Sequence, residues 1–77
     1  MDGMRKSIHT RERAVFVERL RQARFDADLT QAQAAKKLGC TQSYISKIES
    51  GELRVDAVAL QRFAKVYRKD VSYFVRK

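Results

Sequence analysis

The chain has 77 residues, a formal net charge of +8, a pI near 10.2, no proline and a single cysteine. This length allows one small domain. Cys40 and the only histidine, His9, supply neither an internal disulfide nor a structural zinc site, so we expect no metal and no cofactor. No apolar run approaches the roughly 20 residues of a membrane span, which predicts a cytoplasmic protein without a membrane partner, and the basic charge favours a polyanion.

Residues 1–9 show no sustained hydrophobic period and are predicted to form a flexible basic arm, with Arg5 and Lys6 as its cations. Thr10 is a suitable N-cap for a first helix over about residues 11–26. Apolar residues recur there at spacings of three and four and form one core-facing stripe, made of Phe16, Val17, Leu20, Ala23 and Ala27.

A second, short helix is predicted over about residues 30–38. Thr30 and Gln33 fit a capping box, in which each side chain satisfies a free backbone N–H at the other residue. Gly39 follows the last apolar position and can end the helix with a positive φ. The inner face consists of Ala34, Ala35 and Leu38.

A third helix is predicted over about residues 41–49, capped by Thr41 and terminated by Gly51. At about 100° per residue, Ile45 and Ile48 share one side. The opposite arc is short and mostly uncharged, and it comprises Gln42, Ser43, Ser46 and Lys47. Such side chains are suited to hydrogen bonding with the edges of DNA bases, whereas a solvated helix face more often carries Glu/Lys pairs.

Two more helices complete the expected domain over residues 10–77. Asp56 can cap a helix over about residues 56–68, and Asp70 can cap a short one over about residues 71–75. The apolar stripe of the longer helix comprises Ala57, Leu60, Phe63, Ala64 and Tyr67. The chain is therefore predicted to be an all-α domain of five helices.

The positive charge lies outside the two central helices. Residues 1–24 carry a net charge of +4 and residues 60–77 carry +5, while residues 25–59 carry −1. We therefore expect the flanks to supply most of the non-specific attraction to phosphate, and the helix over residues 41–49 to discriminate with neutral side chains.

Several of these positions together resemble the signature of the Cro/phage-repressor (XRE-type) helix-turn-helix regulators. They are Leu29-Thr30-Gln31, Ala35, Gly39, the run Gln42-Ser-Tyr-Ile-Ser-Lys-Ile-Glu49, and Gly51, and the similarity extends over about residues 12–75. The resemblance implies a lambda-repressor-like domain whose helix over residues 41–49 enters the major groove.

The resemblance also implies roles for individual residues. The base-reading positions match Gln42, Ser43, Ser46 and Lys47, and the phosphate-binding positions match Gln31, Thr41, Tyr44 and Arg54. Arg24 and Glu49 match a pair that forms a partly buried salt bridge in several members, which accounts for a charge beside the apolar stripe.

The sequence departs from this family at Ala34, where a larger aliphatic residue is usual, and we expect Phe16 or Phe25 to fill the space. Tyr67 and Phe74 stand where leucine is common. The final helix offers a candidate dimer interface of Val71, Tyr73 and Phe74, with packing in the protomer's own core as the alternative for the two aromatic residues.

These features predict a sequence-specific regulator of transcription that binds double-stranded DNA as a homodimer on a (pseudo)palindromic operator. The alternative is a protein-binding antitoxin or adaptor module whose DNA binding is secondary. Protein partners under these hypotheses include a toxin, an antirepressor and RNA polymerase. An enzyme is disfavoured, because the sequence carries no paired-carboxylate, nucleophile–base or phosphate-cradling constellation.

Overall fold

The computed structural model describes residues 11–75, so the predicted arm over residues 1–9 and the Thr10 cap lie outside the described residues. Within that range the chain forms five helices: α2 (Arg11–Asp26), α3 (Gln31–Leu38), α4 (Gln42–Glu49), α5 (Ala57–Tyr67) and α6 (Val71–Val75). The predicted all-α fold of five helices is confirmed, and the helices begin and end within one residue of the predicted bounds.

Local capping chemistry explains these bounds. The Thr30 hydroxyl accepts the Gln33 N–H at 3.1 Å while the Gln33 amide oxygen accepts the Thr30 N–H at 2.9 Å, which is the predicted capping box. Thr41 and Asp56 cap α4 and α5 more simply, each with one side-chain oxygen that accepts the backbone N–H three residues later. Gly39 ends α3 at φ 75°, a left-handed conformation that disfavours residues with a Cβ.

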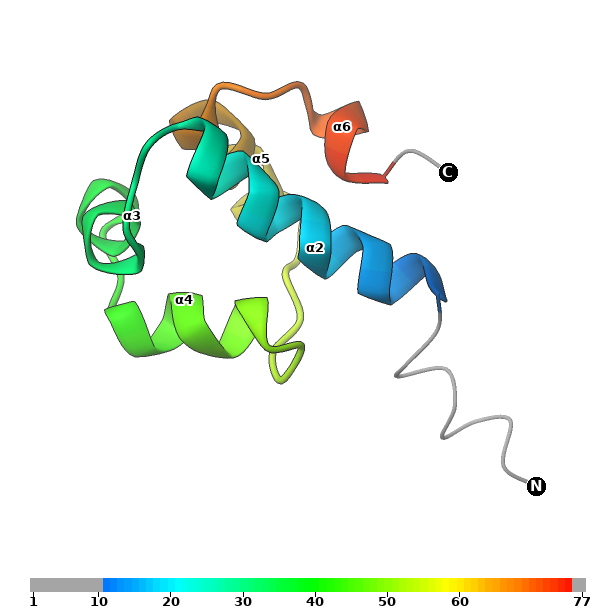
Figure 1. Cartoon of the computed structure of the whole chain (residues 1–77), viewed down its shortest axis with the longest axis horizontal. Coiled ribbons are helices and arrows are strands. Elements are labelled where there is room, and N and C mark those ends of the chain that lie inside the picture. The colour runs from blue at the N-terminus through cyan, green and yellow to red at the C-terminus, as the bar shows by residue number, and fades with distance from the viewer. Residues whose placement is uncertain (1–10, 76–77) are drawn as a thin grey trace.

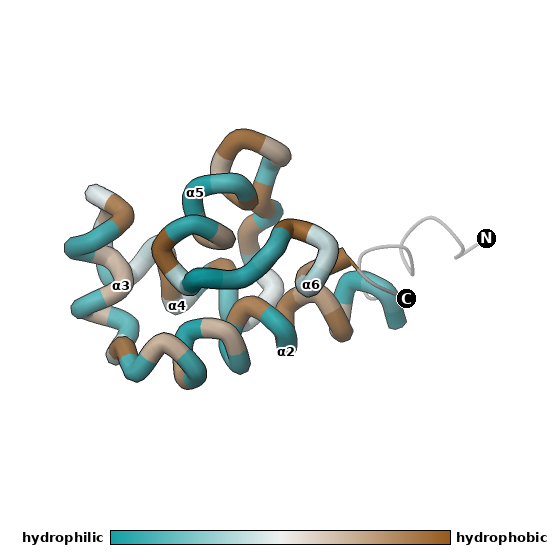
Figure 2. Tube along the Cα trace, turned by 90° about the horizontal axis from the view of Figure 1, so that it is seen from above, coloured by the Kyte–Doolittle hydropathy of each residue, from teal (hydrophilic) through white to brown (hydrophobic). Residues whose placement is uncertain are grey.

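Helix α2 is the central element. Figure 1 shows it passing between α4 on one side and α6 on the other, with α3 and α5 completing the bundle. Helices α3 and α4 pack directly against each other on either side of the Gly39 turn. Figure 2 shows hydrophobic and hydrophilic positions interspersed along the helices, as expected where each helix turns one face inward.

The core is a single cluster to which every helix contributes. Its largest fully buried side chains are Leu20, Ile45, Ile48, Tyr67 and Phe74. The small residues Ala34 and Ala35 of α3 are also buried, at 0% and 4% exposure, and they allow α3 to approach its neighbours closely.

The structure contradicts two predicted core positions, Phe25 and Ala57. Phe25 does not fill space near Ala34, because its side chain is 54% exposed and lies under the Arg24 guanidinium, 4.6 Å from the ring centroid. Phe16 instead packs half-buried against the core cluster. Ala57 is exposed at the first turn of α5, before that helix reaches the core.

Tyr67 of α5 lies within the core at 2% exposure. Burial raises the pKa of Tyr67 well above its ordinary value near 10, because ionisation would place a phenolate in apolar surroundings, and the nearby Glu49 carboxylate acts in the same direction. The folded chain therefore keeps this phenol neutral at a pH where the unfolded chain loses the proton.

The sign of the resulting pH dependence follows from linkage. The contribution of Tyr67 to stability is complete below about pH 10 and is lost as the pH rises above that value, by about 1.4 kcal/mol per pH unit. We expect Tyr67→Phe to remove this decline. In urea titrations, the unfolding free energy of the variant relative to that of the wild type should therefore be higher at pH 11 than at pH 10. Parallel curves for the two proteins would contradict the prediction.

Candidate nucleic-acid interface

Helix α4 has one buried side and one exposed side. Ile45 and Ile48 anchor it in the core at 0% and 1% exposure. The four predicted base-reading residues, Gln42, Ser43, Ser46 and Lys47, are all exposed, and we call them the outer face of α4. This face carries three neutral hydrogen-bonding side chains and one cation, so it offers donors and acceptors with little net charge.

The four predicted phosphate-binding residues differ in how available they are. Arg54 lies exposed in the loop between α4 and α5. The Thr41 hydroxyl already accepts the Tyr44 N–H at 3.1 Å as the N-cap of α4. Gln31 stands in the first turn of α3, where helix N–H groups and the positive end of the helix dipole favour an anion.

Arg24 and Glu49 form the predicted ion pair, and it is buried, with each residue 7% exposed. The contact is bidentate: Arg24 Nε donates to Glu49 Oε2 at 2.7 Å and Nη2 donates to Oε1 at 3.0 Å. Arg24 Nη1 also donates to the Leu29 carbonyl at 2.8 Å, and Gln31 Nε2 donates to Glu49 Oε1 at 3.1 Å. This network joins the end of α2, the start of α3 and the end of α4.

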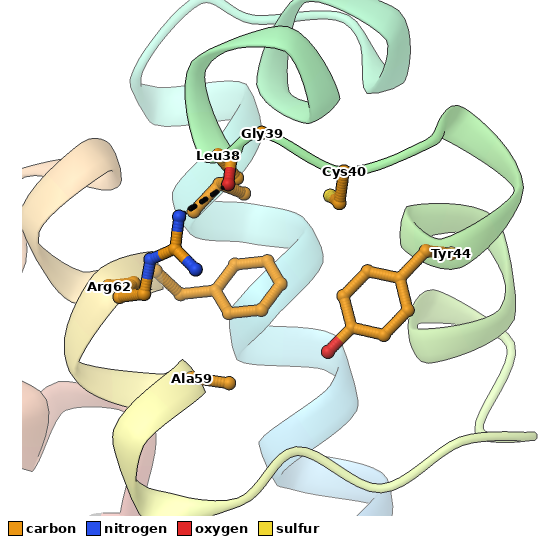
Figure 3. A pocket seen from close by; sticks show the side chains of 7 residues that line it. Leu38, Gly39, Cys40, Tyr44, Ala59 and Arg62 are labelled. Atoms are coloured by element: carbon orange, nitrogen blue, oxygen red, sulfur yellow. Dashed lines mark hydrogen bonds between the residues drawn. The ribbon is translucent and has the colours of Figure 1, made fainter.

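The turn between α3 and α4 borders a hollow of about 190 Å³, shown in Figure 3. The Tyr44 ring and the Cys40 side chain face it from the turn and α4, and Arg62 of α5 lies across from them and donates to the Leu38 carbonyl at 2.6 Å. Burial raises the pKa of the Cys40 thiol, which keeps it in the neutral form.

Tyr44, one of the predicted phosphate-binding residues, lies beside this turn. Its side chain is half-buried, so Tyr44 is not one of the freely exposed residues of α4.

The candidate dimer residues do not share one environment. Phe74 is 1% exposed in the protomer's own core, so its side chain is not on the surface. Tyr73 is half-buried between two cations, with Arg19 and Lys69 at 5.4 and 4.6 Å from its ring centroid. Val71 is 37% exposed and remains available for contact with a second copy.

Sequence reasoning missed a set of arginines that bind helix-end carbonyls. Arg13 Nη2 donates to the Gly51 carbonyl at 2.8 Å, and Arg21 Nη2 donates to the Glu49 carbonyl at 3.2 Å. Arg19 Nη1 donates to the Tyr73 carbonyl at 2.7 Å. These partners lie 28 to 54 residues apart in the chain, so no local pattern could have revealed them.

Comparison with known families agrees with this geometry. Residues 15–72 match the sequence profile described as a helix-turn-helix domain, and the chain belongs to this family. A helix-turn-helix is a DNA-binding motif, so membership indicates DNA binding. No curated protein matches the chain in a sequence search.

Residues 11–75 contain neither a candidate membrane span nor a candidate metal site. No helix there has both the length and the hydropathy needed to cross a membrane. No three of the histidine, cysteine, aspartate and glutamate side chains in that range gather closely enough to hold a metal ion.

The buried pair leads to a stability prediction. Arg24→Met leaves the Glu49 carboxylate buried without its main partner, and we expect a loss of about 3–5 kcal/mol in unfolding free energy. The double variant Arg24→Met/Glu49→Leu removes both charges and should lose less than the single variant. Guanidinium unfolding measures both, with Lys69→Met as a control that removes a more exposed ion pair with Asp26 and a contact with the Tyr73 ring. A double variant less stable than Arg24→Met would contradict the prediction.

Proposed function

We propose that the chain is an XRE-type regulator of transcription that binds a specific double-stranded DNA sequence as a homodimer, with α4 in the major groove. The observation that carries this proposal is the outer face of α4: Gln42, Ser43, Ser46 and Lys47 are all exposed on a helix whose other side is fixed in the core. Gln42 can bind adenine N6 and N7 in bidentate fashion, serine can donate or accept, and Lys47 can approach guanine O6 and N7.

The first turn of α3 supports the placement of α4 beside a phosphate backbone. Gln31 presents its amide there, with one N–H already held by Glu49, and α3 contributes its N-terminal backbone N–H groups. Arg54 follows α4 by five residues and makes no ion pair with any residue of the described range. We propose that Arg54, Gln31 and Thr41 contact phosphates, so that they position α4 without reading sequence.

The homodimer is proposed because a single α4 reads too short a site for high specificity, and a second copy placed one helical turn away, about 10 bp, doubles it. Val71, 37% exposed, and Val75, 56% exposed, leave the outer side of α6 apolar. Tyr73 borders these residues and Phe74 supports them from the core. We also propose that the protein acts in the cytoplasm, without a catalytic activity, metal or cofactor of its own.

Selection of bound duplexes from a random DNA pool tests the proposal. We expect one enriched sequence with two-fold symmetry and half-sites spaced by about one helical turn. Enrichment of an unsymmetrical half-site alone would overturn the homodimer and keep DNA reading. Failure to enrich any sequence at low salt would overturn DNA reading and favour a module that binds a protein such as a toxin, an antirepressor or RNA polymerase.

Substitution of Gln42 separates reading from positioning. We expect Gln42→Ala to weaken binding to the selected site by about 1–3 kcal/mol and to relax the preference at one base pair per half-site, as measured by titration on a panel of single-base variants. Arg54→Ala is the matched control. It should weaken all sequences alike and reduce the slope of log K against log[salt] by about one per protomer. Equal weakening of every sequence by Gln42→Ala would exclude Gln42 as a base-reading residue.

A further inference from the structure

The C-terminal end of α4 is held to α2 by long polar side chains. Arg21 Nη2 donates to the carbonyl of Glu49, the last residue of α4, and Arg13 Nη2 donates to the carbonyl of Gly51, two residues further on. Both carbonyls lie at the negative end of the helix dipole, where a cation is favourable. Arg21 is itself oriented by Glu18, whose Oε1 accepts from Arg21 Nη1 at 3.1 Å.

The two arginines span an open groove. A hollow of about 360 Å³ separates α2 from the end of α4, and its lining includes Val17, Ser50 and the two guanidinium-bearing side chains. The apolar anchors of α4, Ile45 and Ile48, lie on its core side. Along this groove Arg13 and Arg21 bridge α2 and the end of α4 by hydrogen bonds to backbone carbonyls, while the buried Arg24–Glu49 pair joins the same two helices on the core side.

We infer that Arg13 and Arg21 are positioning residues that set the angle at which α4 is presented to DNA. The inference rests on the proposed function and adds to it a specificity determinant that touches no base. Ile45, Ile48 and the buried Arg24–Glu49 pair all hold α4, a helix of eight residues, from its core side, so the contacts on the groove side decide how far it can tilt about them. The hydrogen bonds at Glu49 and Gly51 oppose that tilt at the end farthest from the Gly39 turn.

This position predicts which base contacts depend on the two arginines. Ser46 and Lys47 lie in the second half of α4, within one turn of Glu49, whereas Gln42 lies at the capped first turn. A tilt about the first turn displaces the second half most, and base readout requires donor–acceptor distances within a few tenths of an ångström. Loss of the arginine contacts should therefore affect the base pairs that Lys47 reads more than those that Gln42 reads.

Arg21→Ala tests the inference, with Arg19→Ala as a matched control. Arg19 is also on α2 and also donates to a carbonyl near a helix end, Tyr73 in α6, so its removal costs a similar contact away from α4. The readouts are unfolding free energy, affinity for random duplex DNA, and affinity for a panel of single-base variants of the site selected by the wild type. Lys47→Ala and Gln42→Ala identify which base pairs each side chain reads.

We expect Arg21→Ala to reduce the discrimination at the Lys47-dependent base pairs about tenfold, equivalent to about 1.4 kcal/mol, and to leave the Gln42-dependent base pairs within a factor of two. Affinity for random duplex DNA should also fall, but by no more than the removal of one positive charge accounts for. Arg21→Lys should restore part of the discrimination, and Arg13→Ala/Arg21→Ala should lose more than Arg21→Ala.

Three outcomes would overturn the inference. One is an unchanged discrimination pattern in Arg21→Ala and in the double variant. Another is equal loss at all base pairs, which would indicate general loosening of the domain. The third is the same pattern in Arg19→Ala, which would show that the effect comes from stability alone. If the wild type itself shows no sequence preference, the proposed function fails, and that result is distinct from all three.

Discussion

The arrangement of the helix-turn-helix depends on the buried pair of Arg24 and Glu49. Two opposite charges at 7% exposure lose most of their hydration, and only a bidentate contact with further hydrogen bonds compensates for that cost. The further bonds go to the Leu29 carbonyl and the Gln31 amide, which are the entry to α3. A hydrophobic pair of similar size could stabilise the fold equally well. Its contacts are not directional, however, so it would not restrict α2, α3 and α4 to one relative orientation. The pair therefore fixes where Gln31 and α4 lie relative to each other, and under the proposed function this sets the spacing between a phosphate contact and a base contact.

Basic residues of the flanks contribute to the fold itself. Arg24, Arg21 and Lys69 each form an ion pair with a carboxylate, so part of the flanking charge is neutralised within the domain. Arg19 and Arg62 keep their charge but direct it at carbonyls near helix ends. Fewer Lys and Arg side chains are therefore available for contact with phosphate than the sequence contains, because several of them hold helices together.

The sequence was sufficient for the helices and their caps because both depend on residues close together in the chain. Thr30 and Gln33 are three apart, and the apolar stripes repeat every three or four residues. The orientation of Phe25 was not predictable in this way, since it lies in the last turn of α2, where the chain leaves the helix through Asp28 at a positive φ of 64°. A helix of five residues such as α6 is too short for its period to tell a core residue from an interface residue. The arginine–carbonyl contacts were missed because each joins segments that only the tertiary fold brings together.

The lengths of α3 and α4 give these tertiary contacts their importance. Helices of eight residues are marginal in isolation, so each takes its stability and its direction from its neighbours. Apolar contacts fix the middle of α4, and polar contacts from α2 fix its end. Arg13 and Arg21 are partly exposed and bind backbone carbonyls, so their substitution disturbs the core less than substitution of Ile45 or Ile48. Under the proposed function, a helix-turn-helix built in this way can change which base pairs it prefers through residues on α2, with every side chain on the outer face of α4 left as it is.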